Sequence, residues 1–133
     1  MNKILPAIAM LLCLSMVPAS RAELPPGSYD TLRLEAPEAL LIEVMAVKRA
    51  VKGNATEIVA VGRVLHVERT KVGLRTGATI EIRYIHTNAP MAGPRPVPLL
   101  VEKTIIPAFL KKVDGKDFEP AAYGMSFVMT PER

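Results

Sequence analysis

The sequence is poor in the residues that build covalent or metal-bound frameworks. It contains one cysteine, Cys13, no tryptophan and two histidines, His66 and His86. A single cysteine cannot close a disulfide within the chain, and one thiol cannot supply the several cysteine ligands of a structural zinc site. Aromatic residues make up only 5% of the chain, which argues against rows of stacking platforms for single-stranded nucleic acid. The fold must therefore depend on its aliphatic side chains.

Charge is missing from one long stretch near the N-terminus. Residues 4–17 carry no charged side chain, follow Lys3, and lead into a short run of small residues. This three-part pattern is typical of a secretory signal, and the stretch is shorter than the ~20 apolar residues of a membrane span. We predict a signal peptide over residues 1–22, cleaved between Ala22 and Glu23. The mature protein is then expected to be periplasmic or secreted, with no membrane span.

Two other interpretations of the leader fit less well. Cleavage after Ala19 would place Val17 where a small residue is preferred. A lipoprotein signal ending at Cys13 would require small residues before the cysteine, where Leu11 and Leu12 stand.

Removing the leader changes the composition of what remains. The predicted mature chain has 111 residues, from 23 to 133, which is enough for one domain. Lys3, Arg21 and Cys13 leave with the signal, so Lys+Arg falls from 17 to 15 against 13 acidic residues, and the net charge falls from +4 to +2. This near-neutral, cysteine-free chain offers little support for nucleic-acid binding.

The first mature residues are rich in proline. Pro25 and Pro37 interrupt residues 23–39, and we expect an extended N-terminal arm there. A short helix beginning near Ser28 or Asp30 is the alternative, and Pro37 would end it.

Two β-branched runs follow and predict a hairpin. Residues 40–52 and 57–69 are rich in valine and isoleucine, and Gly53 and Asn54 between them are turn residues. Gly62 in the second run predicts a bulge or sharp bend.

Further strands are expected downstream. Residues 78–87 alternate apolar and polar side chains, as a strand with one buried face requires. Residues 104–110 predict a strand in which Pro107 implies an edge position or a bulge. Residues 125–129 predict a short last strand. We therefore predict an all-β fold, a small five-stranded antiparallel OB-like barrel over residues 40–133, with an antiparallel sandwich as the alternative.

Four segments resemble parts of small exported bacterial domains of the netrin or metalloproteinase-inhibitor type of OB barrel, which are mostly uncharacterised. They are residues 73–84, 93–98, 107–110 and 120–127. The resemblance spans roughly residues 40–128 and implies a fold more than a function. Inhibitors of that type chelate a protease zinc through an N-terminal cysteine. The predicted mature chain begins with Glu23 instead, so this mechanism does not carry over.

No group of residues indicates catalysis, a cofactor or a metal. In an assumed tight hairpin about residues 70–77, His66 and His86 would lie roughly 16 Å apart, too far to share one zinc. Ser28 and Ser126 lie in no nucleophile motif. The carboxylates of Glu57, Glu68 and Glu81 alternate with apolar residues and are expected on the wet faces of strands. We expect a non-enzymatic protein without a cofactor.

Lysines and arginines gather at two places in the mature chain, both beside turns. The clusters are Lys48, Arg49 and Lys52, and Lys111, Lys112 and Lys116. Solvated basic residues are common beside turns, so we expect no nucleic-acid partner.

The proline-rich segment, residues 88–98, is the feature that most suggests an interaction. A stiff, pre-extended segment loses little entropy on binding, although such a segment can equally serve as a plain connector. The candidate contact residues are Met91, Gly93, Pro94, Arg95, Pro96 and Pro98. We predict an exported binding module whose partner is another exported protein. The alternatives are an envelope-acting hydrolase or hydrolase-associated domain, an oligosaccharide- or nucleic-acid-binding OB domain, and a structural accessory subunit. The sequence leaves the oligomeric state open.

Overall fold

The computed structural model describes residues 24–25, 27–87, 93–115 and 117–129. The predicted signal peptide and its cleavage site lie outside these residues. The elements are α1 (Ser28–Glu35), β1 (Glu38–Lys52), β2 (Ala55–Arg69), β3 (Thr79–Thr87), β4 (Ile105–Lys112), β5 (Asp117–Pro120) and the 3₁₀ helix η3 (Tyr123–Met125).

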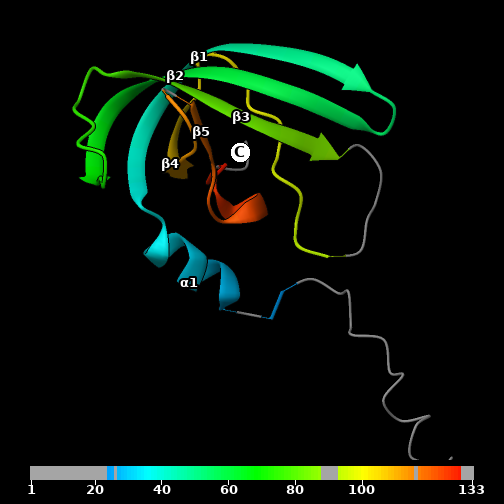
Figure 1. The fold of residues 1–133 in the computed structure, drawn as a ribbon, viewed down its shortest axis with the longest axis horizontal. Coiled ribbons are helices and arrows are strands. Elements are labelled where there is room, and N and C mark those ends of the chain that lie inside the picture. The colour runs from blue at the N-terminus through cyan, green and yellow to red at the C-terminus, as the bar shows by residue number, and fades with distance from the viewer. Residues whose placement is uncertain (1–23, 26, 88–92, 116, 130–133) are drawn as a thin grey trace, which may run out of the picture.

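The five strands form a closed barrel in the order β1-β2-β3-β5-β4 (Figure 1). This confirms the predicted five-stranded OB-like barrel. The prediction that all strands are antiparallel is wrong at one junction, because β3 and β5 pair in parallel, with Ile82 opposite Phe118. The reason is geometric. In a closed ring with an odd number of strands, directions cannot alternate all the way round, so at least one neighbouring pair must be parallel.

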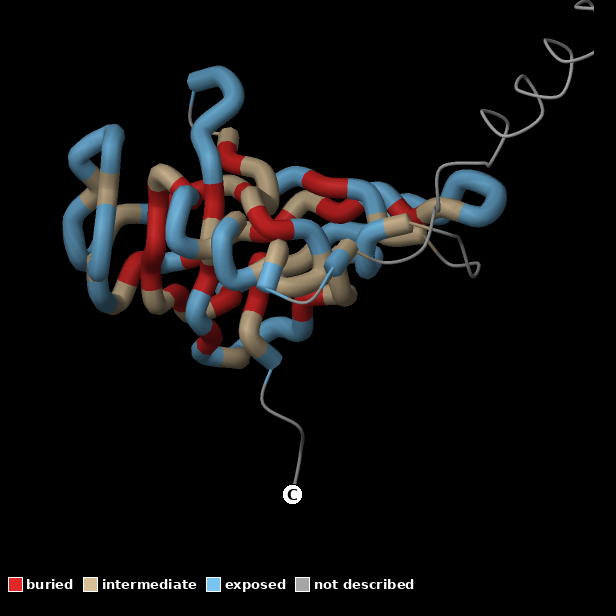
Figure 2. The backbone as a smooth tube through the Cα atoms, turned by 90° about the horizontal axis from the view of Figure 1, so that it is seen from below, coloured by how far each residue is buried: buried red, intermediate tan, exposed pale blue. Residues whose placement is uncertain are grey.

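The barrel interior is filled mainly by aliphatic side chains, with a few aromatic ones, from every side of the ring. Ile80, Ile82 and Tyr84 of β3 point inward, as the predicted alternation requires. The other buried core residues include Ile42, Val44, Ile58, Val64, Leu100, Ile106, Leu110, Phe118 and Phe127. Figure 2 shows the buried residues concentrated in the barrel and the far end of the β1–β2 hairpin exposed.

The predicted hairpin is confirmed, and one of its three register shifts lies where Gly62 indicated an irregularity. β1 and β2 pair from Ala39–Arg69 to Lys52–Ala55, with a register shift at Met45, opposite Gly62 and Val61. The extra residue is therefore in β1, and Gly62 is the partner that makes room for it. A Cβ atom on Gly62 would lie 3.3 Å from Cδ1 of Ile42, which is tighter than ordinary contact.

The stretch expected to be an extended arm over residues 23–39 contains helix α1, and β1 begins at Glu38, before residue 40. Helix α1 begins after Gly27, whose φ of 90° suits glycine, and it ends before Pro37, where the alternative interpretation placed its end. Arg69 of β2 anchors the helix, donating from Nε to the carbonyl oxygen of Ala36 (2.8 Å) and from a terminal nitrogen to that of Arg33 (2.7 Å). These contacts come from a distant strand, so local sequence could not indicate them.

Pro107 lies in β4 without a bulge, and no strand of the described chain pairs with the outer side of β4 at this position. β4 pairs with β1 without a register shift from Glu38–Leu110 to Glu43–Ile105, and β5 pairs on the other side only with residues 110–112. The carbonyl oxygen of Pro107 accepts a hydrogen bond from the N–H of Val128 (3.2 Å). Because N–H and C=O of a strand residue point the same way, the missing donor of Pro107 faces the C-terminal segment and leaves the β1 ladder intact.

The end of the chain differs from the prediction. The short last strand expected over residues 125–129 is reduced to one isolated bridge, between Phe127 and Ala108. The fifth strand is β5, in a stretch for which the sequence predicted no strand. η3 then turns the chain, with Tyr123 at a φ of 47°.

In the part of the chain that the structure describes, α1 is the only α-helix, and no helix is long and apolar enough to cross a membrane.

Candidate interaction surface

The proline-rich segment links β3 to β4 and lies against the barrel. Of its predicted contact residues, Met91 lies outside the described residues. Pro94, Arg95 and Pro96 are exposed, while Gly93 and Pro98 are half-buried. Its described residues, 93–98, contain no strand, so they are held mainly by individual contacts with neighbouring elements.

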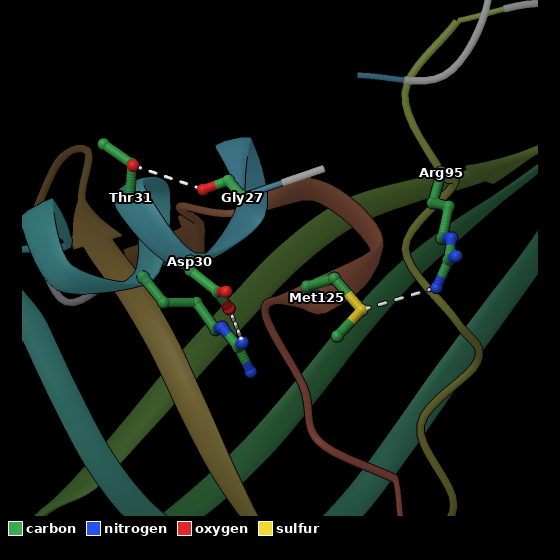
Figure 3. A network of polar contacts seen from close by, with 6 residues as sticks. Gly27, Asp30, Thr31, Arg95 and Met125 are labelled. Carbon is green, nitrogen blue, oxygen red and sulfur yellow. Dashed lines mark hydrogen bonds and ion pairs between the residues drawn. The ribbon is translucent and has the colours of Figure 1, made fainter. Parts of the chain in front are cut away.

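Arg95 is the anchor at the outer end of the segment. Its N–H donates to the hydroxyl of Tyr29 in α1 (2.8 Å), and its carbonyl oxygen accepts from the N–H of Gly124 (2.9 Å). Its guanidinium lies over the Tyr29 ring, 5.8 Å from the centroid. Figure 3 shows the same guanidinium reaching toward Met125, with a terminal nitrogen 3.7 Å from the sulfur. One residue of the segment thus joins the helix to the C-terminal turn.

Gly124 makes this close approach possible. A Cβ atom at Gly124 would lie 2.5 Å from Cβ of Arg95 and 2.8 Å from the carbonyl oxygen of Pro96. Any side chain at Gly124 would therefore push the segment away from η3.

Two side chains of β3 hold the middle of the segment. Tyr84 donates from its hydroxyl to the carbonyl oxygen of Pro98 (2.7 Å) and accepts from the N–H of Leu100 (3.1 Å). Nδ1 of His86 lies 2.7 Å from the carbonyl oxygen of Val97. Burial raises the pKa of Tyr84 to about 12, although the hydrogen bond from Leu100 partly opposes the rise. The hydroxyl is therefore protonated at neutral pH, as its role as donor requires.

The segment and the C-terminal residues together border an open groove of about 280 Å³. Pro96, Pro98 and Met129, which is 37% exposed, are among its lining residues. The remaining lining residues are Gly124, Met125, Phe127 and Val128. Every one of these side chains is apolar. The predicted prolines are thus brought together with a methionine-rich turn that the sequence had not singled out.

A second hollow of about 340 Å³ separates α1 from the barrel. Its lining includes Asp30, Arg33, Arg69 and Phe109. Arg33 pairs with Asp30 and lies over the Phe109 ring, 5.7 Å from the centroid, while Arg69 is bound to carbonyl oxygens of the α1 end. These charges are engaged in attaching the helix.

The structure separates the two histidines further than the sequence suggested. His86 pairs with Thr56 across β2 and β3, whereas His66 lies opposite Leu41. His66 and Thr56 are ten positions apart along β2, roughly 33 Å at ~3.3 Å per residue. The assumed tight turn was wrong, because the β2–β3 ladder ends at Arg63–Thr79. Among the described residues, no group of three histidine, cysteine or acidic side chains could hold a metal ion.

The other candidate residues have structural partners or face solvent. Ser126 is buried and its hydroxyl accepts from the N–H of Ala122 (2.8 Å). Glu57 pairs with Lys52, which lowers the pKa of Glu57 through its hydrogen bond and charge, and Glu81 pairs with Arg83. Glu68 is exposed, and so are the basic residues Lys111 and Lys112, while Lys116 lies outside the described residues.

One buried carboxylate was missed by the sequence reasoning. Glu38 is fully buried at the start of β1, and one of its oxygens accepts from the N–H groups of Lys71 and Val72 (3.0 and 3.1 Å). Its other oxygen is buried and has no hydrogen-bond partner among the described residues. Glu38 thereby ties the loop after β2 to the barrel.

Tyr29, Gly124, Met125 and Met129 are the interface residues that the sequence did not reveal. Each lies in a short, irregular stretch, and nothing in the local pattern connects them to the prolines. No protein-family model, curated protein or solved structure matches the chain.

Proposed function

We propose that this protein is an exported, non-enzymatic interaction module that binds a partner protein through the groove beside its proline-rich segment. The observation that carries the proposal is the apolar lining of that groove, built from Pro96 and Pro98 on one side and the turn from Gly124 to Met129 on the other. An exposed apolar surface next to a rigid segment is typical of protein-binding sites.

The anchoring of the segment supports this function. Contacts from Tyr29, Tyr84, His86 and Gly124 hold its backbone in place before any partner arrives. A surface that is already ordered loses less conformational entropy on binding than a free loop does. The partner that fits is an extended, apolar stretch of another exported protein, because the groove is open and lined without charge.

Export is the second part of the proposal, and it rests on the pattern of residues 1–22. Mass spectrometry of the secreted or periplasmic product should find Glu23 as the first residue. Retention of residues 1–22 in that product would contradict export through a cleaved signal. The binding function is proposed from the groove alone and does not rest on the resemblance to netrin-type or inhibitor-type domains.

A pair of methionine variants tests the binding site. Met129 is 37% exposed in the groove and Met45 is 47% exposed on β1, outside the groove lining. Met129→Glu places a charge against the apolar lining and should reduce capture of the native partner from the periplasmic or secreted fraction at least about tenfold, the effect of losing ~1.4 kcal/mol. Met45→Glu adds the same charge elsewhere and should leave capture unchanged.

The site of contact can be located directly. A photo-crosslinking amino acid at Pro96 should form a defined adduct with one partner, whereas the same group at the exposed Lys71 should not. Equal capture by Met129→Glu and the unchanged protein, together with no adduct at Pro96, would exclude the groove as the binding site.

A further inference from the structure

The second half of β1 presents a sheet edge that the barrel leaves open. β1 pairs with β4 only up to Glu43, and Val44 then exchanges hydrogen bonds with residues 103 and 104 (2.7 and 2.8 Å). Beyond Val47, no residue in the described part of the chain pairs with this side of the strand. Figure 1 shows the β1–β2 hairpin continuing past the barrel with β1 at its border.

The direction of the free backbone groups follows from Val47. Its N–H points away from β2 and donates to a carboxylate oxygen of Glu102 (3.0 Å). Backbone groups alternate in direction along an antiparallel strand, so the N–H and C=O of Arg49 and Val51 point to the same open side. Ala50 and Lys52 face β2.

Glu102 occupies the place that the carbonyl of a docked strand would take. The backbone turns away from β1 at Lys103, which has a left-handed φ of 66°. The Glu102 side chain then reaches back to cap Val47. Because Glu102 is exposed, an incoming strand could displace its carboxylate at little cost, and the edge beyond it needs no rearrangement.

The charge of this edge selects the partner. Lys48, Arg49 and Lys52 lie on the open half of β1, and Lys103, whose N–H donates to the carbonyl oxygen of Val44, is at its start. Lys52 already pairs with Glu57 and Arg49 donates to the carbonyl oxygen of Leu100, so the exposed Lys48 and Lys103 carry most of the attraction. Two copies of the chain paired edge to edge would bring these cations together, which is how natural edge strands avoid self-association. An acidic strand would instead be attracted. Val51 is 73% exposed and offers an apolar contact to every second side chain of that acidic strand.

From these observations we propose that residues Val47–Lys52 of β1 bind an extended acidic segment of a partner protein as an additional β-strand. This mode of binding uses backbone hydrogen bonds for affinity and side chains for selectivity. It is independent of the apolar groove, which is lined by residues of the proline-rich segment and the C-terminal turn. The two sites can therefore be tested separately.

The test uses the isotope-labelled protein and two synthetic peptides with capped termini. One peptide alternates glutamate with valine, and the other alternates lysine with valine. At low salt the acidic peptide should bind at least about tenfold more tightly than the basic peptide, because its charge is opposite to that of the edge. Added salt should reduce this difference, because it screens the attraction. It should slow hydrogen exchange at the amides of Arg49 and Val51 at least about tenfold, because a paired amide exchanges only when the pair opens.

Two variants at one position separate strand addition from general charge attraction. Val51→Pro removes only the outward-pointing N–H, which the β2 ladder does not use, and proline is tolerated on an open edge. It should abolish protection at Arg49. The matched Val51→Thr keeps the donor and the branched shape and should bind as the unchanged protein does.

A third variant keeps the proposal testable if Val51→Pro fails to fold. Glu102→Gln removes a negative charge from the edge and should tighten binding of the acidic peptide. Three results would each overturn the proposal. The first is equal affinity for both peptides, and the second is peptide-induced changes in NMR chemical shift confined to the groove residues. The third is protection of Arg49 and Val51 that grows with protein concentration in the absence of peptide. The last result would indicate a second copy of the chain as the occupant.

Discussion

The two halves of β1 are held against the molecule by different means. In the first half, Glu38–Val44, every residue is buried or half-buried, and the strand is paired with β2 on one side and mainly with β4 on the other. In the second half, Met45–Lys52, only Val47 is half-buried, and β2 is the only strand partner. The register shift at Met45 separates the halves.

Near the start of the second half, the segment that leads from the prolines to residue 104 contacts the barrel without pairing along β1 beyond Val44. It is held there through side chains: Arg49 donates to the carbonyl oxygen of Leu100, Tyr84 bonds Pro98 and Leu100, and Glu102 caps Val47. A continuous ladder opens cooperatively, whereas separate side-chain contacts can be lost one at a time. The comparison therefore places most of the stability in the first half, and the two proposed binding sites lie near or on the second.

The largest expected effect breaks the first half. Ile42 is completely buried in the barrel core, and Ile42→Ala should lower the free energy of unfolding by about 2–5 kcal/mol through lost burial and the cavity left behind. Val51→Ala, at an exposed position of the same strand, should change it by less than about 0.5 kcal/mol. Urea denaturation measures both. Similar losses for the two variants would show that the halves contribute equally.

A smaller effect should follow from crowding the anchor of the proline-rich segment. Gly124→Ala introduces a methyl group 2.5 Å from Cβ of Arg95, and overpacking of this kind costs about 1–3 kcal/mol. Hydrogen exchange should speed up at Arg95, whose N–H bonds Tyr29, while amides of Ile42 and Leu110 keep their protection. Uniform acceleration across the barrel would contradict a separately held segment.

The smallest expected effect is a fall in the free energy of unfolding at alkaline pH. Because the pKa of Tyr84 is raised to about 12 in the folded state from an ordinary value of 10.0, the folded protein keeps a proton that the unfolded chain loses. The stabilisation is complete below pH 10 and is lost as the pH rises toward 12. Tyr84→Phe should flatten this decline in the free energy of unfolding between pH 10 and 12. An unchanged decline would assign it to other groups.

Local patterns in the sequence predicted most of the barrel. Valine and isoleucine runs separated by Gly53 and Asn54 specify the hairpin, since β-branched side chains fit a pleated surface and those two residues suit a tight turn. The alternation around Ile82 specifies β3. Helix α1 was less visible because none of its residues is fully buried and its attachment depends on Arg69, far along the chain.

The candidate interaction surface could be predicted only in part. The prolines marked one side of the groove, because proline fixes φ and stiffens the chain. The other side depends on Gly124 and Met129, which reach the prolines only after the barrel has closed. The open edge of β1 was equally hidden, since a strand's sequence does not say which neighbours it will lack.

By itself, the sequence determined that this chain forms strands around an aliphatic core without a disulfide within the chain, because side-chain alternation and turn residues act over short distances. Only the tertiary structure decided that β3 and β5 run parallel, that Tyr84 holds the proline-rich segment, and that β1 leaves one edge open. Each of these depends on which distant segments meet when the ring closes, and no local preference encodes that choice.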